Sequence, residues 1–112
     1  MSYGAYGRIQ NRVESPRQVE YRLLGQVTGA LIAAKTTEDR RKYFDALLWN
    51  QRVWDAFFHD VSDERNRLPL DLRKRIIALC LLVRRETDAL IEGRGDIDTL
   101  IAVNRNVMDG LR

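Results

Sequence analysis

The chain of 112 residues has few of the features that mark secreted or membrane proteins. It contains one cysteine, Cys80, which excludes an internal disulfide and which we interpret as a buried residue in a reducing compartment. Its longest uninterrupted apolar run, Ile76–Val83, is far shorter than the roughly 20 residues that span a bilayer. The N-terminal MSYGAYGRIQNR lacks the apolar segment of a signal peptide. Together these absences predict a soluble, cytoplasmic protein.

Residues typical of catalytic or metal sites are also scarce. His59 is the only histidine, and although Asp55 precedes it at the spacing of two metal ligands on one helix, a third ligand is missing. We therefore interpret the two as a solvated surface pair. The glycines form no phosphate-binding loop, and the carboxylates Asp96 and Asp98 fit the start of a helix. The sequence predicts that the protein is not an enzyme and holds no metal or cofactor.

Charge is nearly balanced, with 19 basic and 16 acidic residues and a net charge of +3. The excess lies in the N-terminal third, which contains Arg8, Arg12, Arg17 and Arg22. Arginine clusters elsewhere adjoin acidic residues, so we interpret them as solvated helix faces rather than as a phosphate-binding stripe. The basic N-terminal third nevertheless leaves direct contact with RNA as an alternative.

Apolar residues recur at helical spacing in four segments, and no alternation of period two indicates a strand. The first helix is expected to start at Ser15 as N-cap, with Pro16 at the first helical position and Gln18 completing a capping box. The other three are expected from about Asp39 to Val61, from Pro69 or Leu70 to Glu92, and from Ile97 to about Gly110. The predicted fold class is all-α, a single-domain antiparallel bundle of about four helices over residues 15–112, preceded by an irregular, flexible tail over residues 1–14.

Aromatic residues concentrate in Tyr43–Val61, which holds both tryptophans and all three phenylalanines. On a helix, its apolar residues cover about half of the circumference, wider than the roughly 100° stripe of a core-facing helix. Such a helix is either central in its own domain or one wall of a groove for a partner. In the first helix, Gly25, Gly29 and Ala33 form a row of small residues, which indicates either close approach of another helix or a tolerated weak helix.

Two asparagines, Asn50 and Asn104, each lie at the centre of an apolar stripe. A buried amide without partners costs about 1–3 kcal/mol, so both side chains should form hydrogen bonds. They either pair and fix the register of two helices, as polar core residues do in coiled coils, or face a groove and bind the backbone of a partner helix.

Several motifs together resemble the FlaF family of bacterial flagellar biosynthesis regulators. The run from Asn50 to Phe57, NQRVWDAF, is similar to the family's Asn-x-Arg-x-Trp-x-x-Phe core. Leu68-Pro69-Leu70 followed by Arg73 and the ending IAVNRNVMDGLR also resemble the family, as does Tyr6 followed by the SPRQVE segment at Ser15. The resemblance covers essentially the whole chain.

The resemblance implies a small helical cytoplasmic protein that controls production and export of flagellin, beside a second regulator, FlbT, that acts on flagellin messenger RNA. Our leading hypothesis is a chaperone-like partner that binds flagellin and couples its synthesis to secretion, because an apolar groove lined by helices can receive an amphipathic helix. The alternative is a post-transcriptional regulator that contacts flagellin mRNA directly or through FlbT, and a purely structural homo-oligomer is a third. Candidate partner-binding residues are Trp49, Asn50, Arg52, Val53, Trp54, Phe57, Ile77, Leu81, Asn104 and Arg105.

Overall fold

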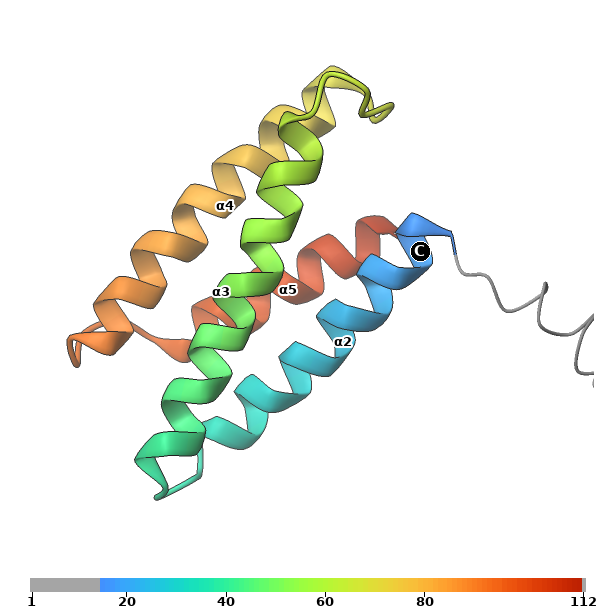
Figure 1. Cartoon of the computed structure of the whole chain (residues 1–112). Helices are drawn as coiled ribbons and strands as arrows, with labels where there is room; N and C mark the ends of the chain where they lie inside the picture. Colours follow the sequence, from blue (N-terminus) through green and yellow to red (C-terminus); the bar gives the residue numbers. More distant parts are fainter. Residues whose placement is uncertain (1–14, 112) are drawn as a thin grey trace, which may run out of the picture.

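A computed structural model describes residues 15–111 of the chain, and the expected tail over residues 1–14 lies outside this range. The described part contains four α-helices: α2 (Pro16–Ala34), α3 (Arg40–Ser62), α4 (Leu70–Ile91) and α5 (Ile97–Leu111). The all-α class and the four predicted segments are confirmed, with helix ends within one or two residues of the predicted ones (Figure 1).

Capping residues set the starts of three helices. Ser15 accepts a hydrogen bond from the Gln18 backbone N–H at 3.1 Å, and the Ser15 backbone N–H donates to the Gln18 side chain at 2.8 Å, so the predicted capping box is present. Asp39 accepts from the backbone N–H of Arg41 at 2.9 Å and caps α3. The Asp96 carboxylate likewise accepts from the Asp98 backbone N–H at 2.9 Å at the start of α5.

An arginine of α4 forms hydrogen bonds with the end of α3 and the start of the α3–α4 connection. Arg73 donates from Nε to the carbonyl of Val61 at 3.0 Å and from Nη2 to the carbonyl of Asp63 at 3.3 Å. These carbonyls lie at the C-terminal end of α3, where helical partners are missing. The Arg73 that belongs to the family-like Leu-Pro-Leu motif therefore has a structural role, since it ties α4 to the end of α3.

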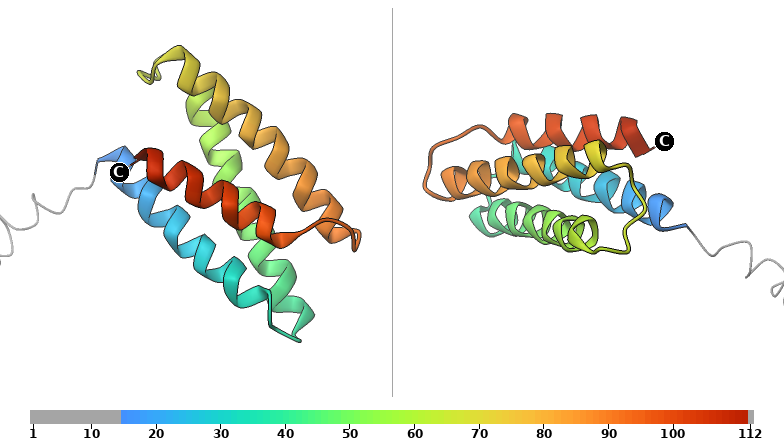
Figure 2. Two further views of the ribbon diagram at one scale, coloured as in Figure 1. Left: turned by 180° about the vertical axis from the view of Figure 1, so that it is seen from behind. Right: turned by 90° about the horizontal axis from the view of Figure 1, so that it is seen from above.

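The four helices run alternately up and down and form two pairs. Helices α3 and α4 pack side by side, as do α2 and α5, and the pairs meet where α2 contacts α3 and α4 contacts α5. Figures 1 and 2 show that the pairs converge at the end that carries the connections 35–39 and 92–96 and diverge toward the connection 63–69. The molecule consequently has a closed end and an open end.

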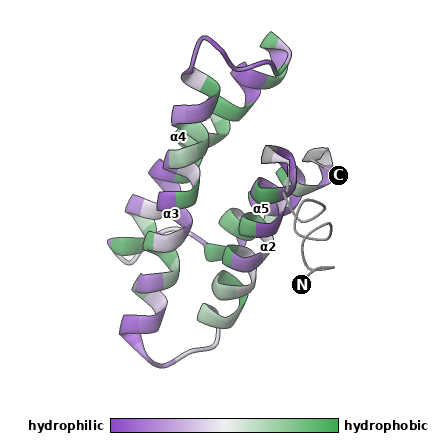
Figure 3. Ribbon diagram, turned by 45° about the vertical axis from the view of Figure 1, so that its right-hand side comes forward, coloured by the Kyte–Doolittle hydropathy of each residue, from purple (hydrophilic) through white to green (hydrophobic). Residues whose placement is uncertain are grey.

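The core is built from one apolar stripe of each helix. Its largest fully buried apolar side chains are those of Trp54, Leu24, Leu31, Leu47, Leu100, Val27 and Val83. Polar residues dominate the connection between α3 and α4, while apolar residues recur along the helices (Figure 3). The wide apolar arc of α3 is only partly used, because Leu48 and Phe58 are exposed. Helix α3 is therefore central to the fold and also has apolar residues on its outer face.

The row of small residues on α2 has two different environments. A Cβ added at Gly25 would lie 3.6 Å from the terminal carbon of Met108, an ordinary contact with α5. A Cβ at Gly29 would meet nothing within 4 Å, and Gly29 is exposed. The interpretation that close helix approach explains the row is therefore wrong at Gly29, where the tolerated weak helix is the better account.

Candidate functional site

A buried polar network joins three helices at the centre of the bundle. Asn104 on α5 accepts from Trp54 Nε1 at 2.8 Å and donates through Nδ2 to Asn50 Oδ1 at 2.8 Å and to Thr28 Oγ1 at 3.1 Å. Asn50, Trp54 and Asn104 have no exposed surface. The prediction that the two asparagines are hydrogen-bonded is confirmed, and of the two alternatives for them the structure shows the pairing.

The network links helices whose backbones do not touch. Helices α3 and α5 lie diagonally across the bundle, so these hydrogen bonds connect them through side chains alone. Within residues 15–111, the buried Asn50 Nδ2 and Thr87 Oγ1 have no hydrogen-bond partner. Since misregistered helices would leave still more buried polar atoms without partners, the network favours one alignment of α3 and α5. A partner could reach these residues only if the bundle opened.

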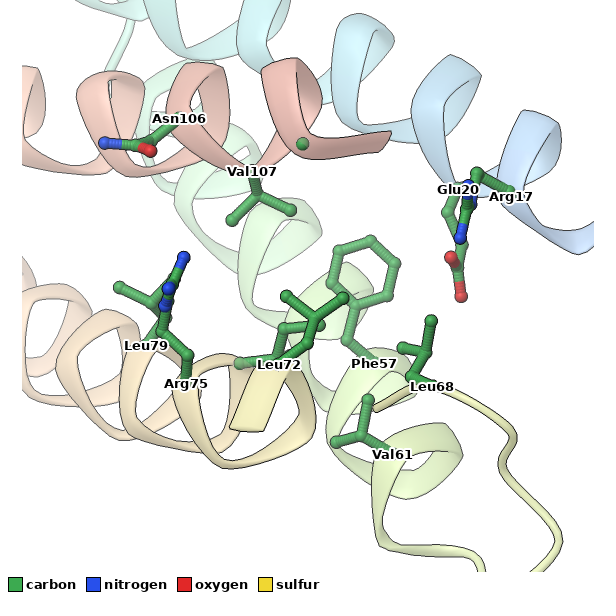
Figure 4. Close-up of a pocket in the computed structure, with 12 residues that line it drawn as sticks. Arg17, Glu20, Phe57, Val61, Leu68, Leu72, Arg75, Leu79, Asn106 and Val107 are labelled. Atoms are coloured by element: carbon green, nitrogen blue, oxygen red, sulfur yellow. The ribbon is translucent and has the colours of Figure 1, made fainter. Parts of the chain in front are cut away.

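An apolar cleft lies at the open end, between the α2–α5 pair and the α3–α4 pair (Figure 4). Its cavity volume is about 90 Å³. Helices α3, α4 and α5 and the α3–α4 connection contribute its apolar lining, and Gly110 of α5 also lines it: Phe57, Val61, Leu68, Leu72, Ile76, Leu79 and Val107. The polar lining residues are Arg17, Glu20, Arg75 and Asn106. This volume is comparable to roughly one inserted aliphatic side chain, whereas sites for cofactors and drug-sized ligands occupy roughly 300–1,000 Å³.

Charge is distributed unevenly along the cleft. Figure 4 places Glu20 and Arg17 of α2 on one side of the apolar residues Phe57 and Leu72, and Arg75 of α4 on the other side. Burial, the charge of Asp60 and a hydrogen bond with the Asp60 carboxyl together raise the pKa of Glu20 to about 7, while Arg17 opposes the shift. Glu20 is therefore a carboxyl group that changes its charge near neutral pH.

The α3–α4 connection holds Asp60 in place through hydrogen bonds from Asn66. Asn66 donates from Nδ2 to the Asp60 carbonyl at 3.1 Å and to the Asp60 carboxylate at 3.3 Å. The same asparagine accepts from the backbone N–H of Leu68, a lining residue of the cleft, at 2.9 Å. The connection thus holds the Asp60 carboxyl group beside the apolar lining.

The residues predicted to bind a partner do not form one surface. Phe57 lines the cleft, Asn50, Trp54 and Asn104 form the buried network, and Val53 is buried. Trp49 lines a second, more open groove at the closed end, beside the alanines of α2 that end at Ala34. Leu81 is 62% exposed on the outer face of α4, where Ile77 is partly buried. Arg52 and Arg105 are exposed.

Sequence reasoning missed most of the cleft because its lining residues come from five separate segments. Leu72 and Leu79 recur at helical spacing along α4, as Val107 does along α5, so the sequence pattern does not distinguish them from core residues. One signal was available in the Leu68-Pro69-Leu70 motif, whose first leucine lines the cleft. A helical wheel assigns a residue to a face, but it does not show that two helix pairs diverge in front of that face.

Reactive side chains are engaged in other contacts. Asp55 accepts from Gln51 at 2.9 Å and forms an ion pair with Arg84 at 3.1 Å. Cys80 is buried, with its Sγ 3.7 Å from the carbonyl oxygen of Trp54, and burial raises the pKa of its thiol to about 11. The thiol is therefore protonated at neutral pH and unsuited to act as a nucleophile. Over residues 15–111, no group of three His, Cys, Asp or Glu side chains could hold a metal ion.

The fold and the cleft define a small all-α protein of the up-down four-helix type. None of the helices within residues 15–111 combines the length and the apolar character needed to cross a membrane. The family model described as flagellar protein FlaF matches residues 2–111, and the chain belongs to the FlaF family. Searches of curated proteins and of solved structures gave no match.

Proposed function

We propose that this protein is a non-catalytic, cytoplasmic regulator of flagellum biogenesis that binds flagellin and couples its synthesis to secretion. Membership of the FlaF family supports a flagellar role. The observation that carries the binding proposal is the apolar cleft at the open end, where the two helix pairs diverge around Phe57 and Leu72. A chaperone-like partner needs such a surface, because the flagellin ends to be held before export are apolar on one face.

The shape of the cleft fits side chains better than a free small molecule. An amphipathic helix presents apolar residues at i, i+3, i+4 and i+7, and a groove between helices accepts them in succession. A cavity of about 90 Å³ takes roughly one such side chain. Walls from both helix pairs would let a bound helix contact α4 and α5 at once, through residues such as Leu79 and Val107.

Among the predicted contact residues, Phe57 is the one that lines the proposed site. The outer face of α4, with Ile77 and Leu81, and the groove beside Trp49 remain separate predicted contacts that the same experiment tests. Arg52 and Arg105 are exposed and line neither the cleft nor the groove beside Trp49, so they remain separate predicted contacts as well.

Calorimetric titration with full-length flagellin, and with flagellin that lacks its terminal helical segments, tests the proposal. We expect a complex that requires the terminal segments and keeps most of its affinity at high salt, since apolar burial is not screened. Leu79→Lys places a charge in the cleft and should weaken binding by roughly tenfold or more. The matched variant Leu81→Lys changes an exposed leucine on the same helix and should leave affinity within about threefold.

Other outcomes would redirect the proposal. If Leu81→Lys abolishes binding and Leu79→Lys does not, the outer face of α4 is the binding surface and the cleft is rejected. Thermal unfolding of each variant shows whether it is folded, and Leu79→Ala replaces Leu79→Lys if the charge prevents folding. Absence of a complex with flagellin would reject flagellin binding, and FlbT and flagellin mRNA would then be titrated as the direct partner.

A further inference from the structure

We call the end of the apolar cleft with Glu20, Asp60 and Arg17 the negative end, because its two carboxyl groups outnumber its one arginine, and the end with Arg75 the positive end. Glu20 of α2 and Asp60 of α3 are close enough to share a hydrogen bond, and Figure 4 shows the Glu20 carboxylate directed toward Leu68 at one end of the cleft. Arg75 of α4 lies at the other end, where Asn106 is the facing polar residue of α5. A partner in this cleft therefore meets opposite charges at its two ends.

The negative end carries more charge than its own surroundings neutralise. Arg17 lowers the pKa of Glu20, but this effect is smaller than the increases caused by burial and by Asp60. Asp60 shares a hydrogen bond with Glu20 and accepts another from the neutral amide of Asn66 at 3.3 Å. Two adjacent carboxylates at the edge of an apolar surface repel each other unless one is protonated or a cation lies between them.

We propose that the cleft selects a partner helix that carries a lysine or arginine beside its apolar stripe, with this cation seated against Glu20 and Asp60. The inference rests on the proposed function only in taking the cleft as the binding site. The cation would relieve the repulsion between the two carboxylates, and the apolar stripe would cover the surface formed by residues such as Leu72 and Leu79. A helix with an acidic residue at the same position would be repelled.

Binding of this kind must depend on pH. Glu20 has a pKa of about 7 in the free protein, and a bound cation favours its charged form. Proton release therefore accompanies binding below neutral pH, and the affinity falls as the pH decreases. From the pKa of about 7, the affinity for a cationic helix should be roughly tenfold lower near pH 6 than near pH 8.

Three designed peptides of about 18 residues test the proposal without flagellin. They share one leucine stripe at helical spacing and differ only at the flanking position, which is lysine, glutamine or glutamate. Fluorescence anisotropy with the full-length protein near pH 8 should show the lysine peptide binding roughly tenfold more tightly than the glutamine peptide. The glutamate peptide should bind more weakly than both.

Neutral variants identify the groups responsible. Glu20→Gln and, separately, Asp60→Asn should each remove most of the preference for lysine, and Glu20→Gln should also remove the pH dependence. Asp88→Asn deletes one exposed negative charge on α4 outside the cleft lining and should retain both effects. It controls for general attraction between a cationic peptide and an acidic surface.

Each result decides the question. Equal affinities for the three peptides, a preference that survives Glu20→Gln and Asp60→Asn, or no binding at all would overturn the inference. Because these measurements contain no flagellin, a lysine preference together with failure to bind flagellin would reject only the proposed function. If the affinity for flagellin changes neither with pH nor in Glu20→Gln, only this inference is rejected.

Discussion

The closed end and the open end of the bundle differ in how completely they bury their apolar side chains. At the closed end, four helices converge and bury apolar side chains such as Leu31, Leu47 and Leu100 completely. At the open end, the pairs diverge and leave Leu72, Leu79 and Val107 only partly covered around a cleft. The polar network of Asn50 and Asn104 is fully buried and joins α2, α3 and α5. The comparison indicates that the closed end and the network hold the fold, while the open end leaves apolar surface available.

The largest expected effect comes from breaking the central network. Asn104→Leu removes hydrogen bonds to Trp54, Asn50 and Thr28 and leaves their polar atoms buried without partners. We expect the free energy of unfolding to fall by about 4 kcal/mol. Urea unfolding followed by circular dichroism measures it. Asn106→Leu, on the exposed side of the same helix, is the matched control and should change stability by less than about 0.5 kcal/mol.

Truncating one leucine at each end sharpens the contrast directly. Leu47→Ala leaves a cavity in the closed end, because Leu47 has no exposed surface, and should cost about 3 kcal/mol. Leu79→Ala removes a side chain that already borders the cleft, and should cost about 1 kcal/mol. Unfolding of both variants by urea gives the two values. Equal losses would mean that the cleft is as well packed as the closed end.

Substitution of glycine by alanine should change stability in opposite directions in the connection at the closed end and on the outer surface of α2. Gly95 has φ of +80°, and a Cβ there would lie 2.5 Å from Glu86 Oε2 and 3.2 Å from Ala89 Cβ. The Glu86 oxygen also accepts from the Asp96 backbone N–H at 2.7 Å, so it is not free to move without loss. Gly95→Ala should destabilise by about 2 kcal/mol.

Gly29→Ala should have the opposite sign. Gly29 lies within α2, is exposed and has nothing within 4 Å of an added Cβ. Replacing it should raise the free energy of unfolding by somewhat less than 1 kcal/mol, because alanine is the better helix former. Thermal unfolding of the two glycine variants beside the wild type checks both signs. A stabilised Gly95→Ala would show that the connection relaxes to admit a side chain.

A similarly small effect is expected from the pH dependence at the open end. The pKa of Glu20 rises from 4.5 to about 7 on folding, so its contribution to stability is fully present below about pH 4.5 and is lost as the pH rises through 7. Because Glu20 is only half-buried, solvent screening limits the contribution to about 1 kcal/mol. Glu20→Gln should therefore be more stable than the wild type near pH 8 by that amount, relative to their difference near pH 4. A constant difference across this range would contradict the raised pKa.

Family membership and local structure were accessible from short segments of the sequence. The Ser15 capping box, Asp39 as N-cap and Gly93 with its positive φ are local devices, and each determines a helix end through residues within a few positions. The spacing of apolar residues then gives four helices and one buried stripe on each. The sequence also predicted that Asn50 and Asn104 are hydrogen-bonded, because a buried amide requires a partner, but it left their pairing and a role in a groove as alternatives.

Tertiary structure alone decided where apolar surface remains uncovered. Trp54 and Leu72 both belong to apolar stripes, yet one is fully buried at the centre and the other borders the cleft. The difference arises from the angle between the two helix pairs. This angle results from the packing of all four helices together, so the sequence of one segment does not predict it. The Glu20–Asp60 contact is of the same kind, since it joins residues 40 positions apart whose pKa shift exists only once both lie beside the apolar cleft. Local propensity and periodicity thus determine the helices and their buried faces, while the divergence of the pairs determines the site.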